Sequence, residues 1–468
     1  MQPLPSPRPP STAGALAGLS LAVLLASLGT SIANVALPTL AEAFAAPFQH
    51  VQWVVLAYLL AITTLIVGVG RLADLGGRRR LLLAGIALFT LASALCAIAP
   101  ALAPLVAIRA VQGLGAAVMM ALTLAFVADI LPKDKTGSAM GLLGTMSAMG
   151  TALGPSLGGG LISAFGWPAI FLVNLPLGVV AFVLCYRHLP AIAAKAAPGR
   201  PAFDTWGMML LALCLGAYAL AMTLGGGRFG PLNLALLAAA VVGAGLFIRV
   251  EARSASPLIR LTLFGDTGLR TGFATSALVA TVIMTTLVVG PFYLSRTLGL
   301  SPAMVGLAMT AGPLVAALTG MPAGRLVDRV GTHRATLAGL AAMTMGAGAL
   351  AVIPSNFGLA GYIAPLVVVT AGYALFQTAN NSGIMSQSHG EQRGVVSALL
   401  NLSRNLGLIT GASVMGAVFA LAWAGTDMTR ATPDAVATGL RTTFAVAAIV
   451  VVVALALTIG GKGRQQPV

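Results

Sequence analysis

Charged residues are scarce in this sequence. Asp, Glu, Lys and Arg together make up 8% of the 468 residues, whereas a soluble domain carries about 25%. Hydrophobic residues make up 58% of the chain, and the mean hydropathy is +0.96. Apolar runs of about 18 or more residues recur, and each is long enough to cross a hydrocarbon core of about 30 Å as a helix. The composition therefore excludes an ordinary soluble protein and predicts a polytopic helical membrane protein.

Signatures of enzymes and of nucleic-acid-binding proteins are also missing. The chain has no G-x-x-x-x-G-K-[ST] loop for ATP, no paired catalytic residues and no cluster of metal ligands. Its three cysteines fall in separate apolar segments, where we expect them to be small core residues. The net charge of +15 does not predict a nucleic-acid partner, because a basic binding domain would be polar. We therefore expect no enzyme, no cofactor, no metal and no nucleic acid.

Fourteen apolar runs, each bounded by charge, Pro or Gly, are the predicted membrane spans. Residues 1–14 are rich in Pro and Ser and are expected to form a disordered cytoplasmic tail. They do not resemble a signal peptide, because the next apolar run is span-length and lacks a cleavage site. The runs lie near residues 15–38, 50–70, 81–100, 103–130, 136–164, 167–187, 205–224, 232–250, 271–294, 301–322, 335–354, 358–386, 394–421 and 438–460.

The basic residues predict the orientation of these spans. With the N-terminus inside, most of the 26 Lys and Arg residues fall in loops on the inner side. This bias follows the positive-inside rule, so we expect both termini to be cytoplasmic and the protein to lie in the plasma (inner) membrane. The exceptions are four arginines on the outer side and two within spans, namely Arg228, Arg296, Arg430, Arg441, Arg109 and Arg404.

A charged phrase occurs twice in the chain. "GRLADLGGRRR" (70–80) follows the second run, and "GRLVDRVGTHR" (324–334) follows the tenth. In a second register, "GLLGTMSAMGTALGPSLGG" (141–159) aligns with "ALLNLSRNLGLITGASVMG" (398–416). Both registers keep their order and their side of the membrane, which disfavours chance convergence. The sequence therefore contains two parallel repeats, the arrangement of a rocker-type transporter.

The repeats define the predicted organisation of an all-α polytopic membrane protein. Residues 15–187 form the N-terminal six-helix half, and residues 271–460 form the C-terminal six-helix half. Between them, residues 188–270 are a linker that holds two extra transmembrane helices. Residues 461–468 form a cytoplasmic tail.

Six motifs resemble those of the major facilitator superfamily, specifically its fourteen-helix drug:proton antiporter branch. "GRLADLGGRRR" resembles the loop 2–3 signature, "RAVQGLGAA" from Arg109 the span-4 signature, and "GTALGPSLGG" the span-5 signature typical of antiporters. "LGTSIANVALP", "IFLVNLPLG" and "FDTWG" are also similar to this branch. The resemblance covers nearly the whole chain and implies the major facilitator fold and export rather than import. The antiporter-motif helix carries a ladder of small residues and one proline, namely Gly150, Gly154, Pro155, Gly158 and Gly159.

The repeated charged phrase also predicts a cytoplasmic gate. Asp74 can accept hydrogen bonds from Arg78 or from a helix N-terminus of the other half, and Asp328 can do the same in the second copy. Such contacts would close the inner side and break when the halves rock. Positive-inside anchoring would explain the arginines but not the aspartates or the glycines, while Asp129 either pairs with Arg78 or is a solvated helix end. The predicted gate residues are Gly70, Asp74, Gly77, Arg78, Asp129, Asp328 and Arg329.

Polar residues inside spans are candidates for the substrate or proton path. A charged residue costs about 2.5–3.5 kcal/mol at a helix centre on insertion scales, so Arg109 and Arg404 should face a cavity or a polar partner. Each arginine is either a structural hub that bonds backbone carbonyls or a group that handles substrate or protons, and we favour the second interpretation. The amides of span 12 line an inner vestibule or bond between helices. The predicted path residues are Asn34, Arg109, Gln112, Gln377, Asn380, Asn381, Asn401 and Arg404.

The branch usually carries an aspartate in span 1, where this chain has Gly29. A buried carboxylate is the ordinary proton carrier and cation ligand in such cavities. Without it, neutral or anionic substrates should be preferred over quaternary-ammonium drugs, and proton coupling should be weak or run through Asp74, Asp129 or the substrate. On this basis Gly29→Asp should raise the transport of lipophilic cations.

The sequence therefore predicts a monomeric secondary active transporter, in contact with membrane lipid, that exports small amphipathic or toxic compounds. Proton antiport would drive this drug efflux by alternating access. One alternative is an exporter of neutral or anionic metabolites with weak or unconventional proton coupling. A second is a non-transporting membrane sensor. A membrane-embedded enzyme is disfavoured because no nucleophile, metal site or carboxylate pair is found.

Overall fold

The structure, a computed structural model, describes residues 12–66, 68–69, 72–73, 77–130, 133–190, 205–224, 230–253, 265–387, 393–421 and 432–462. Within these ranges every regular element is a helix. Short breaks divide some spans, and the C-terminal end of α12 continues as the π-helical turn η2. The helices of the N-terminal part are α1 (Thr12–Ala43), α2 (Phe48–Val51), α3 (Trp53–Ile66), α5 (Arg78–Ala97), α6 (Leu102–Ile130), α7 (Lys133–Phe165), α8 (Ala169–Leu172) and α9 (Asn174–His188).

The remaining helices, from residue 205 onward, belong to the linker and the C-terminal part. Local sequence explains several of their starts: the Asp266 carboxylate caps α12 by accepting from the backbone N–H groups of Gly268 and Leu269 at 2.7 and 3.1 Å. These helices are α10 (Thr205–Thr223), α11 (Pro231–Arg253), α12 (Thr267–Phe292), η2 (Tyr293–Thr297), α13 (Pro302–Val330), α14 (Thr332–Val352), η3 (Ser355–Phe357), α15 (Gly358–Gln387), α16 (Arg393–Thr410), η5 (Gly411–Met415), α17 (Gly416–Ala420) and α18 (Pro433–Lys462).

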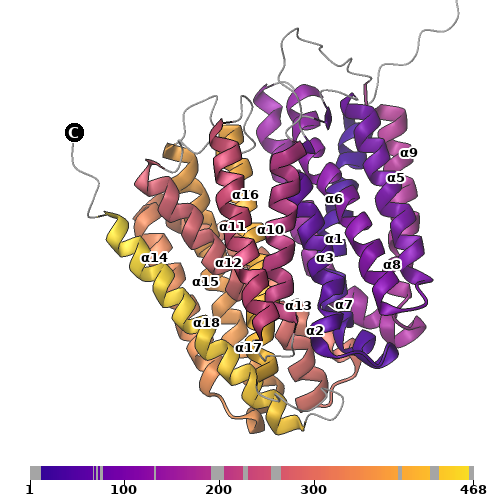
Figure 1. The fold of residues 1–468 in the computed structure, drawn as a ribbon. Helices are drawn as coiled ribbons and strands as arrows, with labels where there is room; N and C mark the ends of the chain where they lie inside the picture. Colours follow the sequence, from indigo (N-terminus) through magenta and orange to yellow (C-terminus); the bar gives the residue numbers. More distant parts are fainter. Residues whose placement is uncertain are drawn as a thin grey trace, which may run out of the picture.

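The helices gather into two groups, which we call the N-terminal half (α1 to α9) and the C-terminal half (α12 to α18). Figure 1 shows the two halves side by side, converging at the lower end of the view, where α2, α13 and α17 lie. The same contact occurs in each half. Ser31 of α1 donates to the carbonyl of Gly150 on α7 at 3.1 Å, and Thr281 of α12 donates to the carbonyl of Gly407 on α16 at 3.1 Å. The aligned glycines thus occupy equivalent places in the two halves.

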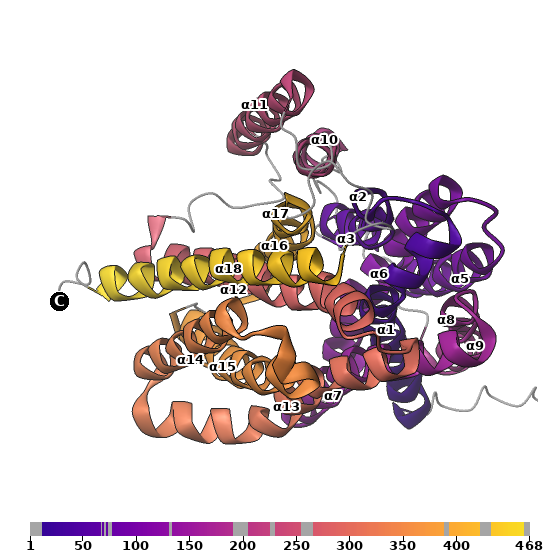
Figure 2. The same ribbon diagram turned by 90° about the horizontal axis from the view of Figure 1, so that it is seen from below.

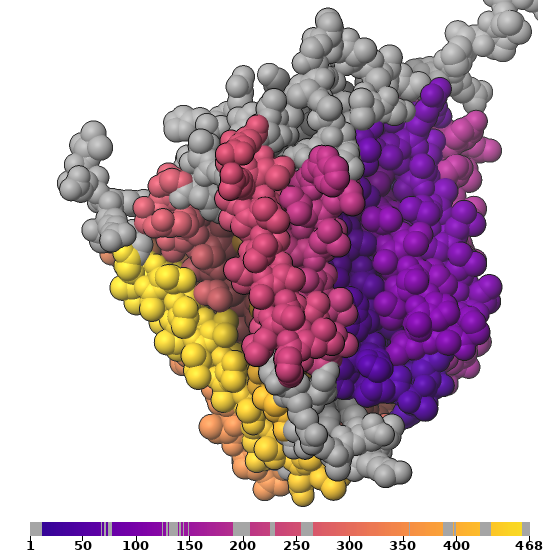
Figure 3. All heavy atoms as spheres, in the orientation of Figure 1, coloured from indigo at the N-terminus to yellow at the C-terminus, as the bar shows by residue number. Residues whose placement is uncertain are grey.

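The linker helices α10 and α11 lie outside this pair of halves. In Figure 2 they form a separate layer at one side, with α11 farthest out. Helix α10 touches both halves, because Trp53 of α3 donates to Thr223 at 3.0 Å and Tyr218 donates to Thr410 of α16 at 3.2 Å. Figure 3 shows the atoms of α10 and α11 covering the junction between the halves on this face.

Twelve helices of the described residues are long and apolar enough to cross a membrane. The predicted runs 136–164 and 394–421 do not meet this criterion, although they lie on the helices α7 and α16–η5–α17. Both segments are rich in Gly and polar residues, which lowers their hydropathy. The first predicted span also begins earlier than expected, since α1 starts at Thr12 within the predicted tail.

Helix α7 uses its small residues on two different faces. A Cβ atom added to Gly150 would lie 3.0 Å from the Ser27 Cβ, and one added to Gly158 would lie 2.8 Å from a Val35 methyl group, so this face packs closely on α1. A Cβ added to Gly159 would lie 3.0 Å from the Gly306 Cα on α13 of the other half. The face with Gly150 and Gly158 is therefore a contact surface within the N-terminal half, whereas Gly159 belongs to a contact between the halves.

Candidate functional site

Five predicted path residues line one cavity in the C-terminal half: Gln377, Asn380, Asn381, Asn401 and Arg404. The cavity measures about 290 Å³ and lies between α12, α15 and α16. We call it the polar cavity. Its residues come from three different helices, so their proximity could not be derived from any one motif. None of the described residues that line it is acidic.

Arg404 is the one cation among the described residues of this lining. Its side chain is exposed, and no hydrogen bond or ion pair joins its guanidinium to any residue that the structure describes. Asn380 has a different role, because its amide nitrogen donates to the carbonyl of Gly272 on α12 at 3.1 Å. Asn380 therefore lines the polar cavity and also bonds between helices.

A second cavity, of about 100 Å³, adjoins the first. Tyr373 lines both, and the other walls of the second cavity are mostly apolar, with Ile283, Leu287 and Leu366 among them. Thr151 of α7 also contributes, so this space reaches the N-terminal half. We call it the apolar cavity. Sequence analysis did not find it, because scattered Leu, Ile and Tyr residues are ordinary in membrane helices.

Arg109 lies apart from both cavities, fully buried in the N-terminal half. Its Nε donates to the carbonyl of Val54 at 2.8 Å, its Nη1 to the Gln112 side chain at 2.5 Å, and its Nη2 to the carbonyl of Gly29 at 3.0 Å. The guanidinium carbon lies 4.2 Å from the centre of the Tyr58 ring. These partners join α1, α3 and α6, which is the arrangement of a structural hub, one of the two interpretations of this arginine.

Two further path residues belong to the packed N-terminal half. Gln112 donates to the Ser93 hydroxyl at 2.6 Å and so links Arg109 to α5. Asn34 is fully buried on α1, and its amide nitrogen donates to the carbonyl of Thr30 at 2.9 Å. Its side-chain oxygen has no partner among the described residues. In this conformation neither residue is part of the polar cavity.

Gly29 occupies a place that changes the expectation for an introduced carboxylate. A Cβ atom there would lie 3.0 Å from the Tyr58 hydroxyl and 3.2 Å from the Phe89 ring, inside the N-terminal half. Arg109 already bonds the carbonyl of Gly29, so an aspartate at this position would pair with that arginine. We now expect Gly29→Asp to leave the ratio of cation to anion export unchanged, measured with ethidium and a fluorescent carboxylate in inside-out vesicles. A selective rise in ethidium export would contradict this expectation.

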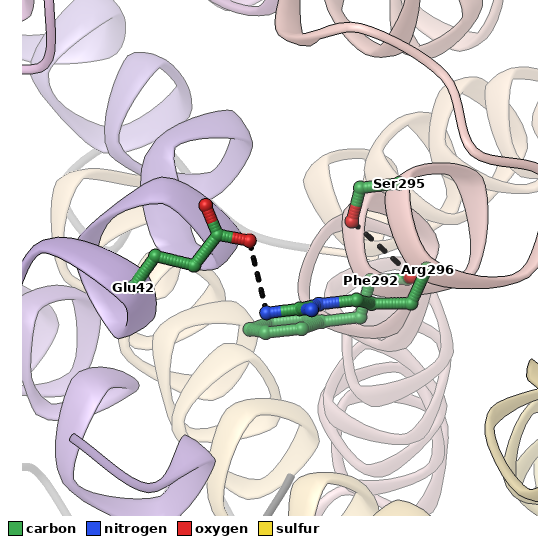
Figure 4. A network of polar contacts seen from close by, with 4 residues as sticks. All are labelled: Glu42, Phe292, Ser295 and Arg296. Atoms are coloured by element: carbon green, nitrogen blue, oxygen red, sulfur yellow. Dashed lines mark hydrogen bonds and ion pairs between the residues drawn. The ribbon is translucent and has the colours of Figure 1, made fainter. Parts of the chain in front are cut away.

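One end of the interface between the halves is closed. Glu42 of α1 and Arg296 of η2 form an ion pair at 2.9 Å across the halves. Figure 4 shows the two side chains approaching each other beside Phe292. The rings of Phe48, Phe292 and Phe419 meet next to this pair, with centroids 4.9 Å apart for Phe48 and Phe292. The sequence contained one signal for this contact, since Arg296 is an exception to the positive-inside pattern.

A buried amide lies in the same closed end. Gln52, between α2 and α3, is fully buried, and neither of its side-chain polar atoms has a partner among the described residues. Gly416 of the C-terminal half lies against it, where an added Cβ would meet its side-chain oxygen. Ser163 accepts from the backbone N–H of Ala303 at 3.1 Å, which ties α7 to α13 nearby.

The described gate residues lie away from this closed end, at the other ends of their helices. Gly77 and Gly331 precede α5 and α14, and both have φ of 85°, a conformation that favours glycine. Asp328 and Arg329 are exposed at the end of α13, and no ion pair joins either to another described residue. Arg78 begins α5. Gly70, Asp74 and the side chain of Asp129 lie outside the described residues.

The described residues offer no group of three His, Cys, Asp or Glu side chains that could hold a metal ion. All three cysteines are free and buried, as predicted for core residues. The two cavities together offer a half-polar, half-apolar space between helices that suits a small molecule.

Comparison with known proteins agrees with this geometry. The sequence profile described as Major Facilitator Superfamily matches residues 19–412 and 271–466. The chain is 33% identical over 430 residues to the multidrug resistance protein Stp of Mycobacterium tuberculosis, covering 90% of this chain and 79% of Stp. It is 31% identical over 402 residues to the riboflavin transporter RibZ of Clostridioides difficile, covering 86% and 87% of the two chains.

A solved structure shares the fold. It is a bacterial homolog of the human lysosomal transporter Spinster, in an inward-facing and unoccupied conformation. The TM-score is 0.71 at 16% sequence identity, over 97% of this chain and 99% of the other. At this identity the likeness concerns the arrangement of helices alone.

Proposed function

The chain belongs to the Major Facilitator Superfamily, and from that premise we propose that it exports small amphipathic or toxic compounds by alternating access. One observation carries the proposal: the halves are joined at one end by the Glu42–Arg296 pair and the aromatic contacts, while Asp328 and Arg329 at the other end are exposed. Transport then consists of breaking the first set of contacts and closing the second.

The finer features follow from the same proposal. All fourteen predicted helices cross the plasma membrane, because α7 and α16–η5–α17 pack beside accepted spans along their length. The basic loops support cytoplasmic termini, and with this orientation the closed end is the outer one and the conformation faces inward. The protein works as a monomer within lipid, and proton entry drives export.

A second candidate is a carrier of neutral or anionic metabolites. The acid-free lining of the polar cavity favours it, and so does the similarity to a protein named as a riboflavin transporter. The two candidates differ in substrate but share the same path and the same conformational change.

Cross-linking across the closed end tests the proposal. In a Glu42→Cys/Arg296→Cys variant, a short thiol-reactive cross-linker should trap the inward-facing state. It should stop transport by proteoliposomes under an imposed pH gradient, measured with a fluorescent carboxylate and with ethidium. The three native cysteines are buried, so the reagent should react little with them. Reduction of a cleavable linker should restore export. The control is Arg296→Cys alone with the same reagent. Full export by the cross-linked variant, or no export by the unmodified protein with any tested compound, would overturn the proposal.

A further inference from the structure

The polar and apolar cavities share a wall. On α12, Ser276 and Ala280 line the polar cavity, and Ile283 and Leu287 line the apolar one. These residues are three or four positions apart, so they follow one face of the helix. The same face of the C-terminal half therefore changes from polar to apolar within about one helical turn.

Along α15 the lining also changes in character, here from apolar to polar as the residue number increases. Leu366 and Thr370 line the apolar cavity, Gln377 and Asn381 line the polar cavity, and Tyr373 between them lines both. A ligand that passes Tyr373 would touch both spaces at once. The space thus suits a molecule with one polar end and one apolar body.

The charge at the polar end is positive and unopposed. Arg404 lines the polar cavity, its side chain is exposed, and it bonds to no described residue. The sequences of α12, α15 and α16, which form the walls, contain no Asp or Glu. A planar guanidinium binds carboxylate and phosphate oxygens through two parallel hydrogen bonds, and side-chain amides such as Gln377 and Asn381 can donate to the same oxygens.

Arg109 does not share this role, although it is the other arginine within the spans. Its donors are taken by Val54, Gln112 and Gly29, and it is fully buried in the other half. Among the described residues that line the two cavities, Arg404 is therefore the one cation that can select an anion. At the apolar end, the lining is mostly apolar, with Ile283, Leu287 and Leu366 among its residues.

We propose that the two cavities form one binding site for an amphipathic organic anion, with its oxyanion on Arg404 and its apolar body past Tyr373. The site rests on the proposed function only in lying on the transport path. It makes the charge of the substrate head, and not its size, the property that this protein selects.

Three probes with one body and different heads test the selection. They are 1-naphthylacetate, 1-naphthylacetamide and 1-naphthylmethyl-trimethylammonium, which are anionic, neutral and cationic. Equilibrium binding to the purified full-length protein in detergent should rank the carboxylate first and the ammonium last. The measurement needs no proton gradient, so it does not depend on transport.

Substitutions then locate the selection. Arg404→Gln should weaken carboxylate binding about tenfold or more, as expected for one charge-assisted contact, and should change amide binding little. Arg404→Lys should lose less, and Ile283→Ala should weaken all three probes by a similar factor. Arg249→Gln is the matched control, because Arg249 is exposed on α11 and lines neither cavity.

Two results would overturn the inference: carboxylate binding unchanged by Arg404→Gln, or tighter binding of the ammonium than of the carboxylate by the unmodified protein. Either result could accompany intact proton-driven export, in which case the proposed function stands. Selective carboxylate binding without any export would instead support the site and contradict the proposed function.

Discussion

Gly154→Val is expected to reduce export at least about tenfold while the protein still inserts into the membrane. A Cβ atom at Gly154 would collide with the Ser31 hydroxyl and lie 2.7 Å from the Ser31 Cβ and 2.9 Å from the backbone nitrogen of Ile32. Because part of this neighbour is backbone, α1 and α7 must move apart. Overpacking of this kind costs about 1–3 kcal/mol. A shift of α7 would also disturb its contact with α13 of the other half, where Gly159 lies against Gly306. We expect export to fall at least about tenfold, a loss equivalent to about 1.4 kcal/mol.

The same helix supplies a matched control. Gly160 lies six residues further along α7, and an added Cβ would meet no atom within 4 Å. Gly160→Val should therefore keep both export and thermal stability. Export is measured in proteoliposomes, and insertion is measured by the amount of monodisperse protein after purification. Normal export by Gly154→Val would show that the contact between α1 and α7 is not needed for transport.

The small-residue contacts were predictable from the sequence because they depend on local spacing. Gly150, Gly154 and Gly158 recur every four residues and so lie on one helical face, and the structure places that face on α1. The repeated charged phrase was informative for the same reason. Gly77 and Gly331 hold corresponding positions in it, and both have the same positive φ.

Contacts between distant helices were not predictable in this way. Glu42 and Arg296 are single charges at two helix ends, and the residues around each contain no pattern that predicts the other as its partner. Tyr373 joins two cavities only because α12 and α15 are adjacent in space. The number of spans is harder still to predict. The Gly and polar residues of α7 and α16 lower the hydropathy of these helices, although such residues also form helix contacts.

The polar residues of the spans show why composition cannot assign a role. Arg109 and Arg404 have the same chemistry and the same insertion cost, yet the first is held by backbone carbonyls and the second faces a cavity. The sequence at Gly29 indicates only that the usual carboxylate is missing. The structure adds that an introduced Cβ would lie against Tyr58 and Phe89, beside the carbonyl that accepts from Arg109, which depends on the packing of α1 against its neighbours.

This difference predicts opposite responses to the change from arginine to lysine. At Arg109 the three donors Nε, Nη1 and Nη2 diverge toward α3, α6 and α1, and a single ammonium group cannot reach all three. Arg109→Lys would keep a buried charge while losing bonds worth about 1.5–3 kcal/mol each.

We therefore expect Arg109→Lys to be at least as damaging as Arg109→Gln, both in thermal unfolding of the purified protein and in export. At Arg404, where only the anion needs a positive charge, lysine should be better than glutamine. The two pairs of variants are compared by melting temperature and by export per amount of folded protein. If Arg109→Lys kept normal stability and export while Arg109→Gln lost both, the charge of Arg109 and not its geometry would be the property that matters, and a direct role in substrate or proton handling would have to be restored to it.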